Sequence, residues 1–454
     1  MANPFEAMTE MARLFQKLDL QKIATLAKKV DISKLLDGVM SMKPEDLEKL
    51  SVAIAKNRNR KQKELPVPDG DFYQISSILT PEEKAIQLRV REFMQKEIAP
   101  IANEYWHKGQ FPMQVIPKLA ALDICGLTYK GYGCPGQRHV LEGFIAEEIA
   151  KVDVSLSTFF GVQSGLAMGS IYLCGSEEQK QEYLPKMQKF ELLGAFGLTE
   201  PDVGSAAAGG LGTTCRREGD TWILNGQKKW IGNATFSDFT IIWARDEADN
   251  QVKGFIVDRT TPGFVTEKIA DKMALRTVQN ALITMTDCRV PEHKRLQEAN
   301  SFKDVSEVLR MTRAGVAWQA VGCARGAYET TVKYAQERMQ FGRPIGSFQL
   351  VQNMLANMVG QLTAMQTMVL RLSEMQDQGL LKDEHASAAK VFCTIGCREV
   401  VSRARELHGG NGILLSYDVA RFVADAEALY SYEGTAQINS LIVGRAVTGF
   451  SSFV

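Results

Sequence analysis

The sequence lacks the features that define several other classes of protein. It has no apolar run long enough to cross a bilayer, which predicts a soluble chain without a transmembrane segment. Lys and Arg together number 53, and Asp and Glu also number 53, so neither charge is in excess. A balanced charge does not force a basic face on the molecule. We therefore expect no nucleic-acid partner.

Metal-binding patterns are missing as well. The chain has only five histidines, and none of them forms an HExxH or HxxxH motif. Its eight cysteines include no CxxC pair. Cys393 and Cys397 share a helix face, but no His/Cys cluster stands near them in the sequence to complete a site. We expect no bound metal, and free thiols in a reducing compartment.

We also expect no targeting signal from the residues at the two ends. The first residues carry Glu6 and Glu10 and lack an apolar signal core, which argues against a secretory or transit peptide. The chain ends Ser-Ser-Phe-Val, which is no peroxisomal address of the Ser-Lys-Leu kind. The expected compartment is the cytoplasm, with the mitochondrial matrix as the alternative.

The pattern of apolar residues divides the main part of the chain into helices, strands and helices again. Thr80 is a good N-cap, Pro81 fits the first helical position and Glu83 can close a capping box, and helical periodicity then continues to about residue 190. From 194 to 300, short apolar stretches separated by turn residues predict an antiparallel β domain. Those stretches are Thr221–Leu224, Phe239–Ala244, Gly254–Val257 and Ala281–Met285. Long helical patterns return from Phe302.

We expect an α+β fold in four parts. These are a helical N-terminal extension (1–65), an N-terminal α domain (66–193), a middle β domain (194–300) and a C-terminal α domain (301–454). In the extension, apolar residues recur at helical spacing from Leu14 to Val39, Lys43–Asp46 resembles a helix start, and Lys56–Lys63 resembles a linker. The extension could dock a partner, a sister subunit or a membrane surface, or simply pack as a helical cap on the rest of its own chain.

The segment Tyr430–Asn439 carries the strongest chemical signal. A carboxylate, Glu433, is followed by Gly434, which leaves room for close approach of a ligand to the backbone, and by Thr435, which could cap the next helix. Such an arrangement suits a catalytic base, although an ordinary helix cap beside a surface glutamate has the same pattern. Other segments of the sequence must therefore decide between a catalytic base and a surface glutamate.

Several further motifs offer groups that hold phosphates or a flat polar ring. Gly194–Ser205 supplies hydroxyls and unblocked backbone N–H groups where helices give way to strands, and Trp230 could lie against an aromatic cofactor. Arg338–Gly342, Ser347–Gln349 and Glu406–Gly412 supply an arginine, amides and a glycine loop, as a pyrophosphate needs. Each motif is individually weak. A turn, a core tryptophan and surface polar residues would explain them equally well.

Taken together and in this order, the motifs resemble the acyl-CoA dehydrogenase and oxidase family over residues 78–452. The likeness is greatest to glutaryl-CoA dehydrogenase and to the plant peroxisomal short-chain acyl-CoA oxidase. The stretches that carry it are Lys130–Gly136, Gly175–Gln179, Leu198–Pro201, Gln227–Asn233 and Gly444–Gly449. The resemblance implies an N-terminal helical domain, a middle antiparallel β-barrel and a C-terminal four-helix bundle.

The resemblance also implies a mechanism and a cofactor, FAD. Glu433 matches the base that removes the α proton of an acyl-CoA while the β hydride passes to the flavin. Burial that raises the pKa of a carboxyl toward the working pH suits that role. The backbone N–H of Glu433 and a flavin ribityl hydroxyl would stabilise the charge that develops on the thioester oxygen.

Further positions match ligand contacts of the family. Those that match the flavin site are Phe196, Leu198, Thr199, Ser205, Trp230, Gly232, Thr435 and Gln437. Those that match contacts to the FAD of a neighbouring subunit are Arg338, Gln340, Phe341, Gln349, Glu406, Leu407, His408, Gly409 and Gly410. Those that match contacts to the acyl-CoA substrate are Ser205, Arg313 and Gly434, and Ser157 falls at a substrate-binding position. A homodimer or homotetramer is the implied assembly.

The chain departs from the family pattern at four positions. Phe196 replaces a frequent Tyr, Ala206 replaces a common Asp, and Gly232 replaces the usual Thr or Ser. Ser157 stands where glutaryl enzymes place the arginine that binds the distal carboxylate of their substrate. Thr158, Phe159 and Phe160 follow it, and an uncompensated carboxylate there would be costly. A glutaryl substrate is therefore not expected.

The leading interpretation is a short- to medium-chain acyl-CoA dehydrogenase that passes electrons to an electron-transferring flavoprotein. The first alternative is an acyl-CoA oxidase that uses O2 and makes H2O2, because the plant oxidase shares the Trp-Ile-Gly-Asn stretch. A flavin monooxygenase or nitroalkane oxidase is a third reading, against which Glu433 argues. A catalytically inactive scaffold is the alternative outside enzymes.

Overall fold

The computed structural model describes residues 41–43, 45–46, 49 and 65–451. The chain divides into two units, Met1–Val67 and Pro68–Val454. In the first unit, Glu45, Asp46 and Lys49 are helical, and the Asp46 N–H donates to the Lys43 carbonyl at 2.9 Å. The helical spacing predicted from Leu14 to Val39 and the linker predicted at 56–63 lie outside the described residues. The remainder of the fold concerns the second unit.

The second unit begins with helices. The predicted capping box forms, because Thr80 Oγ1 accepts from the Glu83 N–H at 3.3 Å and Glu83 Oε2 accepts from the Thr80 N–H at 2.9 Å. Two π-helical segments, η2 (Met94–Ile98) and η4 (Gly161–Ala167), interrupt this region. The α-helices are α5 (Pro81–Phe93), α6 (Ala99–Lys108), α7 (Ile116–Ala120), α8 (His139–Ala150), α9 (Val154–Phe160), α10 (Met168–Cys174) and α11 (Glu177–Gln188). A small hairpin joins β1 (Lys130–Gly131) to β2 (Cys134–Pro135).

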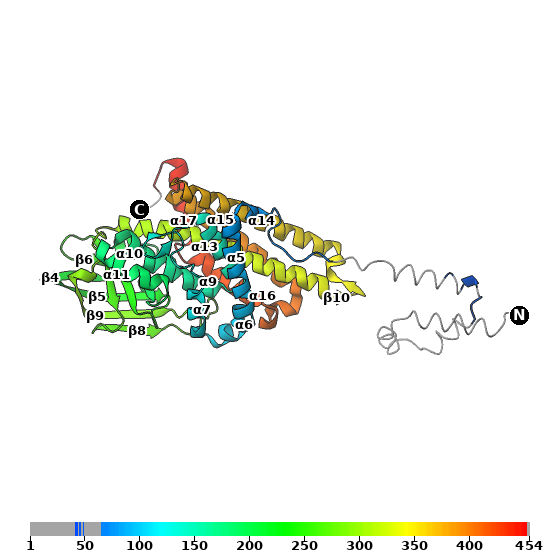
Figure 1. The fold of residues 1–454 in the computed structure, drawn as a ribbon, viewed down its shortest axis with the longest axis horizontal. Coiled ribbons are helices and arrows are strands. Elements are labelled where there is room, and N and C mark those ends of the chain that lie inside the picture. The colour runs from blue at the N-terminus through cyan, green and yellow to red at the C-terminus, as the bar shows by residue number, and fades with distance from the viewer. Residues whose placement is uncertain (1–40, 44, 47–48, 50–64, 452–454) are drawn as a thin grey trace. The chain divides into compact units, whose positions relative to one another are not determined.

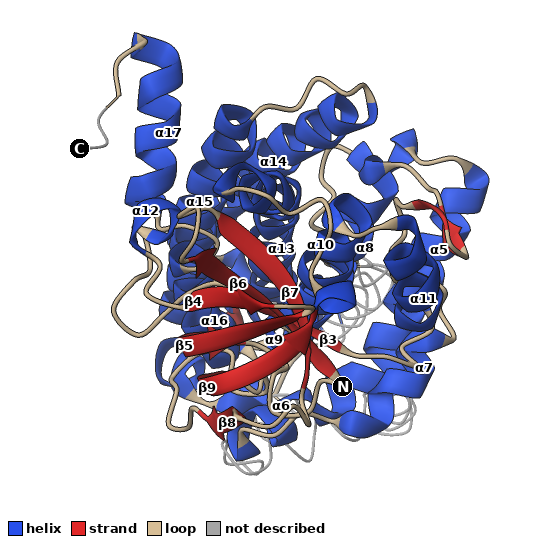
Figure 2. Cartoon of the chain, turned by 90° about the vertical axis from the view of Figure 1, so that its left-hand side faces the viewer, coloured by secondary structure: helices blue, strands red, loops and turns tan. Residues whose placement is uncertain are grey.

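A seven-stranded sheet follows, interrupted by the short helix α12 (Ala207–Gly210). Its strands are β3 (Gly194–Gly197), β4 (Thr214–Glu218), β5 (Thr221–Ile231), β6 (Phe239–Asp246), β7 (Val252–Asp258), β8 (Phe264–Lys268) and β9 (Ala281–Pro291). They pair in the order β3-β6-β4-β5-β9-β8, with β7 on β6. Figure 2 shows β6, β4, β5 and β9 side by side. The expected β domain is thus present, but β3 and β4 each pair with β6 in parallel, and the other pairings are antiparallel.

Strand β5 is bent where it approaches the candidate site. Its register against β9 shifts between Leu224 and Gly226, and Gly226 has φ +138°. A side chain at Gly226 would start 2.7 Å from the Thr213 backbone, so only glycine fits this bulge. Beyond the bulge, Lys228 is fully buried while Trp230 is 53% exposed. Residues two positions apart in a regular strand face the same side, so it is the second register shift, between Lys228 and Ile231, that separates the buried lysine from the exposed indole.

The C-terminal part is helical again. Its helices are α13 (Phe302–Glu337), α14 (Gln349–Asp377), α15 (Asp383–His408), α16 (Val419–Ser431) and α17 (Ala436–Thr448). Helix α15 contacts each of the other four, which makes it the centre of the bundle. The hairpin of β10 (Met339–Gln340) and β11 (Arg343–Pro344) joins α13 to α14. In Figure 1 this hairpin lies at the opposite end of the second unit from the sheet.

Two hydrophobic cores hold the unit together. The larger core joins the helices that precede the sheet to those that follow it; for example, the Phe144 and Trp318 rings lie 5.1 Å apart. The smaller core belongs to the β domain itself and contains Trp222 and Phe255. In the part of the chain that the structure describes, we find no helix that is both long and apolar enough to cross a membrane.

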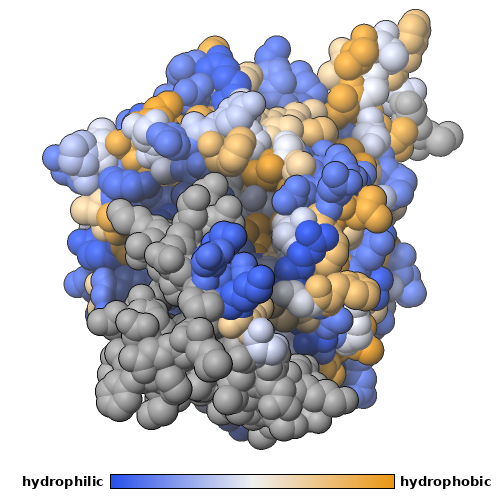
Figure 3. Space-filling view, turned by 90° about the vertical axis from the view of Figure 1, so that its right-hand side faces the viewer, coloured by the Kyte–Doolittle hydropathy of each residue, from blue (hydrophilic) through white to orange (hydrophobic). Residues whose placement is uncertain are grey.

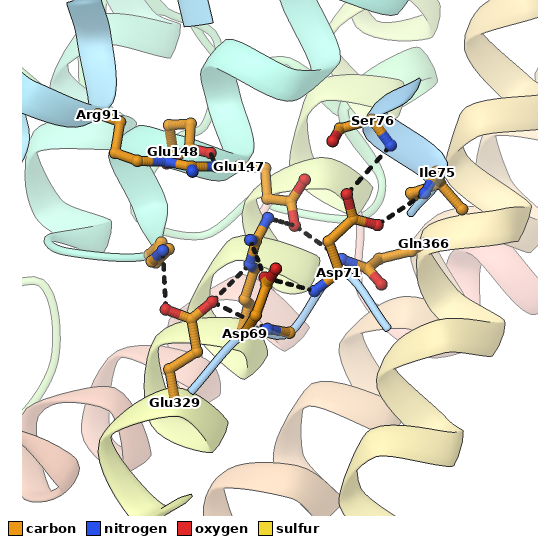
Figure 4. A network of polar contacts seen from close by, with 12 residues as sticks. Asp69, Asp71, Ile75, Ser76, Arg91, Glu147, Glu148, Glu329 and Gln366 are labelled. Carbon is orange, nitrogen blue, oxygen red and sulfur yellow. Dashed lines mark hydrogen bonds and ion pairs between the residues drawn. The ribbon is translucent and has the colours of Figure 1, made fainter. Parts of the chain in front are cut away.

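A buried network of charges anchors the start of the second unit (Figure 4). The Arg325 guanidinium on α13 donates to Glu147 Oε1 at 3.1 Å, to Glu329 Oε1 at 2.7 Å and to Asp69 Oδ1 at 2.8 Å. The Gly70 N–H also donates to Glu329 Oε1, at 3.0 Å. Only 3% of the Arg325 side chain is exposed. The segment that enters the unit is therefore held against α13 by Arg325 and Glu329.

Candidate active site

Glu433 lies in the tight turn between α16 and α17. Both Glu433 (φ +55°) and Gly434 (φ +83°) have left-handed backbone conformations, which is unusual for a glutamate. Thr435 then caps α17 as predicted, since its hydroxyl accepts from the Ile438 N–H at 3.2 Å. The turn thus places the Glu433 side chain by an unfavourable backbone geometry that neighbouring groups must maintain.

Glu433 is half-buried, and its carboxyl faces α13. Its Oε2 accepts a hydrogen bond from the Thr312 hydroxyl on α13 at 3.1 Å. Burial raises the pKa of this carboxyl above its ordinary value, whereas Arg313, the Thr312 hydrogen bond and Lys390 each oppose the rise. A carboxylate with a raised pKa is a stronger base than a free one. The environment is therefore that of a general base.

Arg313 follows Thr312 on α13 and is predicted to contact the substrate. Only 11% of its side chain is exposed, and its nearest carboxylate, Asp383, lies 3.9 Å from Nη1. Among the described residues, no group accepts a hydrogen bond from its buried Nε. A largely buried cation with a spare donor, adjacent in sequence to the Thr312 that binds the base, is suited to a ligand that brings its own acceptor.

Ser157 lies on α9, where its side chain is buried. Its carbonyl accepts a hydrogen bond from Gln319 Nε2 at 3.2 Å, and Gln319 Oε1 in turn accepts from the Tyr432 hydroxyl at 2.6 Å. Thr158 Oγ1 lies 3.5 Å from the same Tyr432 oxygen. Ser157 is thus connected to the residue before Glu433 through side chains that are all uncharged at neutral pH. This cluster contains no cation that could pair with a carboxylate.

The predicted flavin residues of β3 and the following loop are organised by a buried ion pair. Lys228 Nζ donates to the Leu198 carbonyl at 3.0 Å and to Glu200 Oε1 at 2.8 Å. The Glu200 carboxylate also accepts from the backbone N–H groups of Gly212 and Thr213. The Lys229 N–H donates to the Thr199 carbonyl at 2.8 Å. Leu198 and Thr199 are therefore fixed through their backbones.

The remaining predicted flavin residues differ in accessibility. Ser205 and Gln437 are exposed, and Trp230 presents an exposed indole from a left-handed backbone (φ +67°). The Phe196 ring instead packs in the core, with its centroid 6.2 Å from that of Trp243. The Phe196 ring can therefore present only its edge to a cofactor. The main contact of Phe196 with a cofactor would come from its backbone.

Segment η4 connects this part of the β domain to the base. On one side, a side chain at Gly232 would start 3.3 Å from Val162 Cγ2. On the other, a side chain at Gly165 would start 3.2 Å from Thr312 Cγ2. The predicted residue Gly232 and the base partner Thr312 thus flank the same seven-residue segment, so the structure brings the two halves of the site together.

A second group of predicted residues lies elsewhere. Arg338, Gln340 and Phe341 end α13 and form the hairpin, and Gln349 begins α14. His408, at the end of α15, stacks on Tyr334 with ring centroids 4.1 Å apart, which brings the loop 406–410 to the same end of the bundle. Along α13, the 26 residues from Thr312 to Arg338 span about 39 Å. One chain therefore cannot bring this group and Glu433 to the same ring.

The turn between α16 and α17 that carries Glu433 is called the base turn below. Three residues that bind this turn were missed in the sequence analysis. Thr312 binds the Glu433 carboxyl, Lys390 Nζ donates to the Gly434 carbonyl at 2.7 Å, and Asn439 Nδ2 donates to the same carbonyl at 2.8 Å. Thr312 directly precedes the predicted Arg313, which is a weak signal. Lys390 gives none, because nothing in the sequence relates a lysine within a helical pattern to a turn 43 residues later.

Comparison with known proteins gives a consistent result over the whole second unit. Three family models match in order: the acyl-CoA dehydrogenase N-terminal domain over residues 80–191, the middle domain over 195–288 and the C-terminal domain over 302–448. "Probable acyl-CoA dehydrogenase YngJ" of Bacillus subtilis is 34% identical over 373 residues, which cover 81% of this chain and 98% of that protein.

Two further proteins extend the comparison. "Caffeyl-CoA reductase-Etf complex subunit CarC" of Acetobacterium woodii is 34% identical and covers 80% of this chain and 97% of its own. The crystal structure of a glutaryl-CoA dehydrogenase from Mycobacterium smegmatis in complex with FADH2 superimposes with a TM-score of 0.83 at 33% identity. That match covers 86% of this chain and 100% of the other.

Proposed function

Because this chain belongs to the acyl-CoA dehydrogenase family, we propose that it desaturates a short- to medium-chain acyl-CoA thioester to the trans-2-enoyl-CoA, with Glu433 as the base. The observation that carries the proposal is the half-buried Glu433 carboxyl, which accepts a hydrogen bond from Thr312 and whose pKa is raised by burial. The protein is an oxidoreductase, and its cofactor is FAD.

The donor set fits FAD. Close to the base, the fixed backbone of Leu198 and Thr199 offers polar groups to the edge of a flat ring, and the exposed Trp230 indole offers a face. At the other end of the bundle, the exposed Arg338 offers a guanidinium, which is suited to a pyrophosphate, and the exposed Gly409 and Gly410 directly follow the last residue of α15. When bound, FAD supplies the acceptor for the hydride that leaves the β carbon.

The chain's own residues carry the other half of the reaction. The Glu433 carboxylate takes the α proton, and the electron pair of the broken α C–H bond becomes the new carbon–carbon double bond as the β hydride departs. Charge that builds on the thioester oxygen is stabilised by donors already in place, for which the Glu433 backbone N–H is the candidate. Gly434 leaves the backbone open to the thioester, and Arg313 and Ser205 are the candidate groups for contacts with the rest of the acyl-CoA.

We infer that two copies of the chain complete each site. The roughly 39 Å along α13 between the base and Arg338 separates two groups that both match FAD contacts. Apolar side chains around the second group also remain uncovered, among them Phe341 (91% exposed) and Leu350 (80% exposed). Figure 3 shows further apolar residues on the projecting C-terminal helix. A homodimer, or a homotetramer built from two dimers, would cover these surfaces.

The uncharged cluster at Ser157 favours an acyl chain without a distal carboxylate. The polar side chains of this cluster form hydrogen bonds with one another and with the Ser157 carbonyl, and none of them is a cation. They are Gln319, Tyr432 and Thr158. A glutaryl group would bury its second carboxylate without a partner, which is unfavourable. We therefore propose a simple short- to medium-chain acyl group as the substrate.

The proposed electron acceptor is an electron-transferring flavoprotein, with O2 as the alternative of an oxidase. Anaerobic loss of the yellow flavin colour on adding a series of acyl-CoA thioesters tests the desaturation itself. Aerobic production of H2O2, compared with reduction of an artificial dye, separates the two acceptors. A protein that stays colourless after incubation with FAD would contradict the proposal. The proposed compartment is the cytoplasm.

A further inference from the structure

Lys390 lies in the N-terminal third of α15, and its side chain is fully buried. Its Nζ donates to the Gly434 carbonyl at 2.7 Å and to the Tyr430 carbonyl at 3.4 Å. These two carbonyls lie on either side of Glu433 in the sequence. We propose that Lys390 is a positioning residue that sets the conformation of the base turn, an inference that rests on the proposed function of Glu433.

The turn requires such an external contact. Tyr430 belongs to the last turn of α16, where carbonyls have no partner within their own helix. Glu433 and Gly434 then adopt successive left-handed conformations, and a glutamate there is strained. One ammonium group that binds both flanking carbonyls fixes the ends of the strained segment. Asn439 supports it from α17, donating to the Gly434 carbonyl at 2.8 Å and to the Thr435 carbonyl at 3.1 Å.

A lysine at this place also contributes charge. Burial lowers the pKa of Lys390 to about 8, and Glu433 opposes that shift while Arg313 adds to it. The charged groups that face one another are therefore Glu433 on the turn, Arg313 on α13 and Lys390 on α15. The ammonium stabilises the carboxylate form of Glu433, as Arg313 does. A neutral side chain of similar size would fill the same space but supply neither the two hydrogen bonds nor the charge.

The test separates removal of the α proton from hydride transfer. In a 3-thiaacyl-CoA, sulfur replaces the β carbon, so no β hydride can leave, and exchange of the α protons with D2O reports the base alone. We would measure this exchange and flavin bleaching by butyryl-CoA in the FAD-loaded wild type and in Lys390→Met. FAD content and thermal stability would be recorded for each protein.

We expect Lys390→Met to retain FAD and to slow both exchange and bleaching about 100-fold, because a misplacement of about 1 Å has an effect of that size. The KM for butyryl-CoA should change little. Lys390→Gln, which keeps a donor but not the charge, should recover part of the rate. The acidic limb of its pH–rate profile should lie about half a pH unit or more above that of the wild type. The reason is that loss of the Lys390 charge raises the pKa of Glu433. If Lys390→Met does not fold, Lys390→Gln decides the question through this limb.

Lys151→Met is the matched control. Lys151 is also largely buried (13% exposed), and its Nζ lies 2.8 Å from Glu329 Oε2, in the network of Figure 4 and not at the base turn. We expect it to lose stability while its exchange rate and pH profile remain those of the wild type. A folded, FAD-loaded Lys390→Met with wild-type exchange and an unshifted limb would overturn the inference alone. A wild type that neither bleaches nor exchanges would overturn the proposed function as well.

Discussion

The Thr312 hydroxyl donates a hydrogen bond to Glu433 Oε2 across 3.1 Å and so joins the first turns of α13 to a turn 121 residues later. The contact fixes the direction of the carboxyl and stabilises its charged form. It acts against burial, which favours the neutral form. The balance between these effects sets the pH at which Glu433 can act as a base.

Replacing Thr312 by Val should therefore shift the pH dependence of the reaction. Without the hydroxyl, the pKa of Glu433 rises further, and the carboxylate needed for catalysis forms only at higher pH. We expect the acidic limb of the anaerobic bleaching rate to move upward by about one pH unit, the size of one hydrogen bond to a charged group. Thr312→Ser keeps the hydroxyl and should keep the limb near that of the wild type. An unshifted limb in Thr312→Val would show that the contact has no influence on the base.

Substitution of Arg338 tests the second group of cofactor residues. Arg338→Ala should lose FAD during gel filtration, measured as the ratio of flavin to protein absorbance, because a guanidinium is removed from the proposed pyrophosphate site. Arg343, on the same hairpin, instead lies over the Phe348 ring at 4.2 Å. Arg343→Ala should retain its FAD. Equal retention by both variants would place the pyrophosphate elsewhere.

Coexpression of two inactive variants tests whether each site uses two chains. In a mixed dimer of Glu433→Gln and Arg338→Ala, one site carries both defects and the other carries neither, if the sites are shared. About one quarter of the wild-type sites should then recover activity, from the statistics of random pairing in a two-fold dimer. If each chain forms its own site, every site keeps one defect and mixing restores nothing.

The nature of the acyl group is tested with three thioesters, of which two differ only in a free or esterified distal carboxyl group. Butyryl-CoA and the methyl ester of glutaryl-CoA should bleach the flavin, whereas glutaryl-CoA itself should not. The reason is the uncharged cluster of Gln319, Tyr432 and Thr158, which gives a distal carboxylate no partner. Efficient bleaching by glutaryl-CoA, comparable to that by its methyl ester, would contradict this assignment.

Local signals in the sequence predicted part of this structure well. The capping box of Thr80 and Glu83 and the cap at Thr435 involve residues three positions apart, so short patterns suffice for them. Four of the strands were predicted within longer observed elements. Strands β3, β4 and β8 were not, because they are short and β4 and β8 are largely exposed along their length. The parallel pairing of β3 and β4 with β6 depends on long-range topology, which local patterns do not encode.

The same limit applies to the site. Glu433 could be proposed from its motif, but its partners Thr312 and Lys390 come from two other helices of the bundle. The Lys228–Glu200 pair, which fixes the Leu198 backbone, joins strand β5 to the loop after β3, a contact between distant segments that the sequence does not indicate. Predictions about individual cofactor residues therefore remain proposals, whereas the family and the fold are established.

The most direct measurement is anaerobic titration of FAD-loaded Glu433→Gln with butyryl-CoA, followed by the flavin absorbance. The amide preserves the size of the side chain but cannot accept the α proton, so FAD should stay bound and its colour should persist at every concentration. The wild type, treated identically, should bleach. Normal bleaching in Glu433→Gln would contradict the assignment of Glu433 as the base.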